Sequence, residues 1–103
     1  MAEPLLESFN KQPGENFPFA VDFAGLLPTG TTISSVAVSA KNLTTNAVDN
    51  SVIDNAVGGV SGTSAVARVK AGTDGVTYKI TFSVTLSDGS VLEEDVLMVV
   101  ADR

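Results

Sequence analysis

The stretch Val76–Ser87, with the sequence VTYKITFSVTLS, decides the fold. Apolar residues occupy every second position without a break, and the positions between them hold threonine, serine and lysine. The apolar set is Val76, Tyr78, Ile80, Phe82, Val84 and Leu86. A period of two over this length is typical of a β-strand with one buried face. Because that face needs a second layer packed against it, the stretch predicts a protein built from two β-sheets.

The following segment predicts a hairpin, because Asp88-Gly89 is a turn signal between two alternating runs. A two-residue loop would pair Ser87 with Ser90 and bury two carboxylates, at a cost of several kcal/mol. A three-residue loop pairs Ser87 with Val91 and leaves only Glu94 on the buried side. The expected pairs are then Leu86 with Leu92, Phe82 with Val96, Ile80 with Met98 and Tyr78 with Val100. We therefore expect a three-residue loop with a left-handed glycine, or an equivalent bulge.

Shorter alternating runs predict further strands, over 17–24, 35–40, 65–71 and, with poor periodicity, 48–54. Pro18 cannot donate a ladder hydrogen bond, so the first run belongs at a sheet edge or at the start of a sheet. Ile33 is out of phase with the run that follows it, which predicts a bulge near Ser34. Clusters of glycine and proline separate these runs.

The number and spacing of the runs predict an all-β fold, namely an immunoglobulin-like antiparallel sandwich of about seven strands. We expect a single domain over residues 9–103, preceded by an N-terminal tail over 1–8. Such sandwiches place a tyrosine near the start of the second-last strand, with its hydroxyl bonded to backbone a few residues upstream. Tyr78 is the one tyrosine of the chain and lies at that position. The expected structural residues are therefore Tyr78, Asp74 and Gly75 at this entrance, and Asp88 and Gly89 in the hairpin.

The composition restricts the chemistry that the chain can perform. Its 103 residues include no cysteine and no histidine, so disulfides, thiolate zinc sites and histidine-based nucleophiles are excluded. Twelve acidic residues against six basic ones give a formal charge of -6. That balance argues against nucleic acid and against an anionic membrane surface as partners. We expect a protein that is not an enzyme and has no cofactor, no metal and no catalytic residues.

Acidic and glycine-rich segments of the sequence are candidate binding sites. Glu93–Asp95 is the densest acidic run, which could hold Ca²⁺ or face a basic partner, but charges in a strand more often discourage aggregation. Oxygen-rich segments at 49–50 and 54–55 invite the same calcium interpretation without the spacing of a calcium loop. Gly58, Gly59 and Gly62 lack the lysine of a phosphate loop and predict a flexible hairpin tip instead.

Several turn and strand motifs point to a known group of proteins. Lys11–Glu15 reads KQPGE and leads into a strand that ends in Val21–Phe23. Gly72, Gly75 and Tyr78 form a G-x-x-G-x-x-Y pattern, and Ser87–Gly89 reads SDG. With these motifs the chain resembles the small immunoglobulin-like proteins encoded among the tail and head-tail genes of tailed bacteriophages and prophages. The resemblance extends over about residues 8–100.

The resemblance implies a structural or assembly protein of a phage particle, of the tail, head-tail or fiber-tail adaptor type. It implies contacts with other virion proteins, a possible homo-oligomer on assembly, and no catalytic residues. The first residues lack the basic and apolar segments of a secretory signal, so we expect a cytoplasmic protein that joins the virion on assembly. The alternative is an immunoglobulin-like binding module of a bacterial surface or adhesin-type protein, possibly dependent on Ca²⁺.

Overall fold

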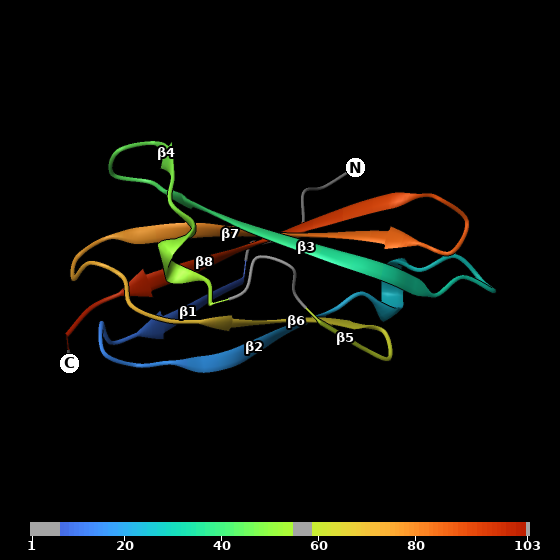
Figure 1. Ribbon diagram of the computed structural model, residues 1–103, viewed down its shortest axis with the longest axis horizontal. Helices are drawn as coiled ribbons and strands as arrows, with labels where there is room; N and C mark the ends of the chain where they lie inside the picture. Colours follow the sequence, from blue (N-terminus) through green and yellow to red (C-terminus); the bar gives the residue numbers. More distant parts are fainter. Residues whose placement is uncertain (1–6, 55–58, 103) are drawn as a thin grey trace.

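The computed structural model describes residues 7–54 and 59–102, and these form two β-sheets packed as a sandwich (Figure 1). The five-stranded sheet consists, in spatial order, of β1 (Glu7–Lys11), β8 (Val91–Val100), β7 (Thr77–Leu86), β3 (Ile33–Asn42) and β4 (Ala47–Val48). The three-stranded sheet consists of β2 (Phe17–Asp22), β6 (Ser64–Val69) and β5 (Gly59–Ser61). Two 3-10 turns, η1 (Ala24–Leu26) and η2 (Asn50–Val52), lie in the connections. The predicted all-β sandwich is confirmed, with eight strands in the described residues.

One pairing departs from the antiparallel expectation. β1 runs parallel to β8, with Glu7 opposite Val96 and Lys11 opposite Val100. All other neighbouring strands are antiparallel. β1 therefore includes Glu7 and Ser8, two residues before the expected start of the domain. The parallel pairing uses the backbone groups along the last half of β8, which would otherwise remain unpaired at the edge of the sheet.

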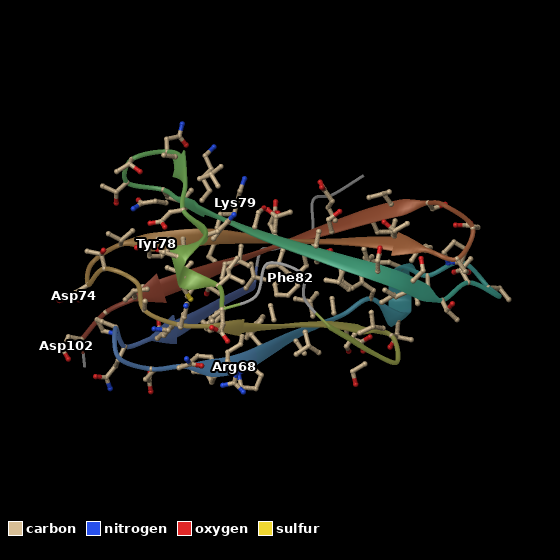
Figure 2. All side chains as sticks on the ribbon, in the orientation of Figure 1. Arg68, Asp74, Tyr78, Lys79, Phe82 and Asp102 are labelled. Carbon is tan, nitrogen blue, oxygen red and sulfur yellow. The ribbon has the colours of Figure 1, made fainter. Side chains whose placement is uncertain are left out.

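The core lies between the two sheets and is centred on the alternating stripe of β7. Tyr78, Ile80, Phe82, Val84 and Leu86 are each at most 2% exposed, as the sequence predicted. Figure 2 shows Phe82 between the layers. Full burial of a side chain of this kind stabilises a fold by roughly 2 kcal/mol, so the stripe contributes on the order of 10 kcal/mol before conformational entropy is counted.

The β7–β8 hairpin has the expected three-residue loop, but its register differs from the prediction by two residues. The Leu86 amide donates to the Ser90 carbonyl at 2.8 Å, and the Gly89 amide donates to the Leu86 carbonyl at 2.9 Å. Gly89 has a φ of 92°, which is the predicted left-handed conformation. The loop is therefore residues 87–89, and Phe82 lies opposite Glu94 instead of Val96.

The shift has a cause outside the hairpin. The Ser87 amide donates to the Thr32 carbonyl at 2.8 Å, and the Ser87 hydroxyl oxygen accepts from the Thr32 amide at 3.1 Å. Ser87 is thus bonded to the segment that leads into β3, so the turn begins there. Because the shift is an even number of residues, every side chain keeps its predicted face.

Other local predictions are confirmed. β2 pairs only with β6 and is an edge strand, as Pro18 requires. The ladder between β3 and β7 shifts register between Ile33 and Ser35, which is the predicted bulge. Ala65, Ala67 and Val69 are buried along β6.

The predicted strand over 48–54 is wrong. The chain forms only the two residues of β4 before it turns into η2. The Asp49 carboxylate accepts from the Ser51 amide at 3.1 Å, and the Asn50 side-chain oxygen accepts from the Ala40 amide at 2.9 Å. Polar side chains here bond to backbone amides locally, and such bonds compete with a regular strand ladder.

Candidate functional site

One end of the sandwich is organised around a buried lysine, and we call it the lysine end (residues 11–16, 71–76 and 100–102; left in Figure 1). Lys11 is 0% exposed. Its ammonium group donates to the carbonyls of Gln12 at 2.8 Å and Pro13 at 3.3 Å, and to the carbonyl of Ala71. Three acceptors match the three donors of an ammonium group, which is the condition for burying this charge.

The electrostatics of Lys11 follow from its position. Burial lowers the pKa of the Lys11 ammonium group from its ordinary value of 10.5, and the nearby carboxylate of Glu15 opposes that shift. Glu15 also closes the turn, because its carboxylate accepts from the Gln12 amide at 2.7 Å while its own amide donates to the Gln12 carbonyl at 3.0 Å. The KQPGE motif therefore builds a turn whose carbonyl groups face the lysine that precedes them.

Tyr78, Asp74 and Gly75 all lie at the lysine end. The Thr73 amide donates to the Tyr78 hydroxyl oxygen at 3.0 Å, which is a bond to backbone five residues upstream. The Asp74 carboxylate accepts from the Asp102 amide at 3.0 Å, and Figure 2 shows these two residues together at this end. Gly75 has a φ of 86° and its amide donates to the Val100 carbonyl at 2.8 Å. Asp74 and Gly75 thus join the β6–β7 connection to the C-terminal end of the described chain, and Tyr78 holds the same connection against β7.

Gly72 has the tightest surroundings of the glycines in the described residues. It has a φ of 98°, and a Cβ atom added there would lie 2.8 Å from Cγ2 of Val100. Only glycine satisfies both the backbone conformation and this close approach. The glycine of the G-x-x-G-x-x-Y motif thus allows Val100 to pack beside the ring of Tyr78.

The opposite end, which we call the hairpin end (residues 22–32, 62–63 and 87–90), contains Asp88 and Gly89. The Asp88 carboxylate accepts from the Ser90 amide at 2.9 Å, and this bond lowers the pKa of Asp88 from its ordinary 3.8. Asp22 accepts from the Ala24 amide and from the Thr63 hydroxyl, both at 2.9 Å, and its pKa is lowered for the same reason. These bonds are at the surface, in contrast to those of Lys11 and Tyr78.

The acidic run Glu93–Asp95 lies at an edge of the five-stranded sheet. Within the described residues β1 covers only Val96–Val100 of β8, so the first half of β8 has no neighbour on that side. Glu93 is exposed, and Asp95 accepts from the Thr81 hydroxyl at 2.7 Å. The position fits charges that oppose pairing of this edge with another strand.

In the described residues, the side chains of the oxygen-rich segments do not come together at a common site. Asp49 and Asn50 bond to backbone amides, and Asp54 pairs with Lys70 at 3.5 Å. Asn55 and Gly58, which entered the calcium and glycine-tip interpretations, lie outside the described residues. No group of three or more acidic side chains in the described part of the chain is arranged to hold a metal.

No helix of residues 7–54 and 59–102 is long and apolar enough to cross a bilayer.

Sequence reasoning missed the burial of Lys11. The sequence did contain a signal for it. Lys11 lies two residues after Phe9, so the two side chains share one face of the strand, and Phe9 packs against the core. It also missed the placement of Lys41 directly opposite Lys79 on β3 and β7, because that pairing depends on the register of two distant strands.

Comparison with protein families identifies a relationship. The model of the family Gp77, described as podophage GP4 fiber-tail adaptor protein gp77, matches residues 11–99. The chain belongs to the Gp77 family of fiber-tail adaptors. The match begins at the buried Lys11 and ends one residue before Val100, so it spans both sheets and both ends of the sandwich. No curated protein and no solved structure matches the chain significantly. The Gp77 family indicates a structural protein of a phage tail, as the sequence motifs implied.

Proposed function

We propose that this protein is a non-catalytic adaptor subunit of a phage tail, which joins other virion proteins through protein–protein contacts. The observation that carries the proposal is the family match over residues 11–99. In this proposal the chain is made in the cytoplasm, becomes part of the virion on assembly, and uses neither nucleic acid nor a membrane as partner. Its net charge of -6 supports the last point.

The strand order supports an immunoglobulin-like topology. If β2 to β8 are taken in sequence as strands B, C, C′, D, E, F and G, the two sheets contain B, E, D and C′, C, F, G. That division matches the arrangement of immunoglobulin domains. Tyr78 is then the second residue of strand F, where such domains carry their corner tyrosine.

A rigid sandwich suits an adaptor because it holds its contact surfaces at fixed positions. The buried bonds of Lys11 and Tyr78 tie the turns of one end to each other and to the C-terminal strand. Rigid partners lose little conformational entropy on association, so more of the contact free energy remains available for binding.

The direct test is deletion of the gene in the phage that carries it, followed by electron microscopy and mass spectrometry of the particles. We expect particles that retain head and tail but lack fibres, do not adsorb, and recover both properties when the wild-type gene is supplied in trans. Fully fibred, infectious particles from the deletion strain would contradict the proposal.

A further inference from the structure

The outer face of the five-stranded sheet is open in the described structure and has an unusual distribution of charge. Its side chains are those of odd-numbered residues on β7, on β8 and, after the bulge, on β3 from Ser35 onward, because the even-numbered ones face the core. The middle of the face has small side chains, namely Ser39, Thr81 and Ser83 on neighbouring strands. Figure 2 shows Lys79 pointing away from the interior on this side and Arg68 on the opposite outer face.

Two lysines lie side by side on this face. Lys41 of β3 is the cross-strand partner of Lys79 of β7, and Val48 of β4, which is 73% exposed, is the next residue in the same row. Like charges placed directly opposite each other destabilise a sheet. In the described part of the chain the side chain of neither lysine makes an ion pair or hydrogen bond. The pair is therefore a local concentration of positive charge on a protein with a net charge of -6.

Two carboxylates lie on the same face, further along and on the adjacent strand. Glu93 and Asp95 are on β8, opposite Ser83 and Thr81 of β7. Lys79 is opposite Leu97, one row beyond Asp95. Asp95 is therefore a diagonal neighbour of Lys79 on the adjacent strand. The face has a basic half at Lys41 and Lys79 and an acidic half at Asp95 and Glu93, and the two halves meet where Lys79 lies next to Asp95.

A surface with this pattern is complementary to itself. Two copies related by a two-fold axis that lies in the plane between the faces, near Thr81, would bring each acidic half onto the other copy's basic half. Such an isologous contact uses the same patch on both subunits. We infer that this outer face binds a second copy of the chain, with Lys41 and Lys79 of each copy facing Glu93 and Asp95 of the other.

The size of the face is adequate for a specific contact. β3, β7 and β8 have ten residues each, so with a rise of ~3.3 Å and a strand spacing of ~4.8 Å the face measures roughly 33 Å by 15–20 Å. A stable interface covers ~800 Å² on each partner, and the face with its flanking β1 and β4 approaches that area. The inference goes beyond the proposed adaptor role, because it concerns the association of the purified protein with itself.

The experiment uses two face variants and their mixture. Lys41→Glu with Lys79→Glu makes the face wholly acidic, and Glu93→Lys with Asp95→Lys makes it wholly basic. Sedimentation velocity from micromolar to millimolar protein should show a dimer for the wild type. Each variant alone should dissociate with a Kd raised on the order of tenfold or more, as for close charge pairs at other interfaces. An equimolar mixture of the two variants should form a heterodimer, because every contact is then between opposite charges.

The matched control for the lysine variant is Arg68→Glu with Lys70→Glu, which makes the same change in net charge at an exposed residue of β6 and at the residue that follows that strand. Circular dichroism of all four proteins establishes that they are folded. The control should dimerise like the wild type. A wild type that is monomeric at millimolar concentration overturns the inference. An assembly that both face variants leave unchanged, or two face variants that stay monomeric when mixed, overturns it equally.

Discussion

The two ends of the sandwich are held together in different ways. At the lysine end, buried side chains bond to the backbone of the connecting loops, as Lys11 does with the Ala71 carbonyl and Tyr78 with the Thr73 amide. At the hairpin end, exposed side chains bond mainly within their own turns, as Asp88 does with Ser90. Removing a partner from a buried hydrogen bond leaves a desolvated group without compensation, whereas water replaces an exposed partner. The same kind of substitution should therefore cost more at the lysine end.

The largest effect is expected for Lys11→Met. The substitution keeps the apolar stem but leaves the carbonyls of Gln12, Pro13 and Ala71 without their donor. We expect the free energy of unfolding to fall by about 3 kcal/mol, measured by urea denaturation. Lys70→Met removes a lysine whose ion pair with Asp54 lies at the surface, and should cost less than ~0.5 kcal/mol. Equal losses for the two variants would contradict the distinction between buried and exposed side-chain bonds on which the comparison of the ends rests.

Two glycine variants separate backbone strain from packing. Gly72 and Gly89 both have positive φ angles, of 98° and 92°. Gly89→Ala should cost ~1 kcal/mol, because nothing lies within 4 Å of the added Cβ and only the backbone is strained. Gly72→Ala adds a contact of 2.8 Å with Val100 and should cost about 2–3 kcal/mol. Thermal unfolding of the pair measures the difference, and a Gly89→Ala variant that is the less stable of the two would show that the hairpin end is the tighter one.

A smaller effect is expected for Tyr78→Phe. The ring stays in the core, and the Thr73 amide loses its acceptor. We expect a loss of about 1–2 kcal/mol in urea denaturation. Thr31→Val is the control, since it removes a hydroxyl that donates to the Pro28 carbonyl at the exposed hairpin end, and it should cost less than ~0.5 kcal/mol. A neutral Tyr78→Phe variant would mean that water reaches the Thr73 amide.

The smallest effect is expected for Asp22→Asn, on the fall of Tm at acidic pH. Hydrogen bonds from the Ala24 amide and the Thr63 hydroxyl lower the pKa of Asp22 below its ordinary 3.8 in the folded protein. The unfolded chain then binds more protons in acid, so this contribution to stability is present above pH 3.8 and disappears as the pH falls through the folded pKa. Asp22→Asn should therefore show a slightly weaker fall of Tm in acid than the wild type. Identical dependence of Tm on pH for the two proteins would show that the hydrogen bonds of Asp22 do not stabilise the hairpin end.

The sequence predicted much of the fold because strand faces are a local property. The alternation from Tyr78 to Leu86 is enough to predict which face of the strand is buried. The backbone preferences of Gly89 and Pro18 are likewise set by the residues themselves. The strand prediction for residues 48–54 was wrong because polar side chains of this segment bond to backbone amides, and such bonds compete with a strand ladder. Of the candidate site, the motif residues at the lysine end were identified, but the burial of Lys11 was not.

What the sequence by itself determined is which side chains face inward, where the chain turns, and the family to which its motifs belong. The tertiary structure alone decided the register of β7 against β8, the parallel pairing of β1, and the placement of Lys41 against Lys79. The physical reason is the range of the interactions. Side-chain alternation and turn preference act over a few neighbouring residues, whereas pairing and desolvation depend on groups that only folding brings together, such as Ser87 with Thr32 and Lys11 with Ala71.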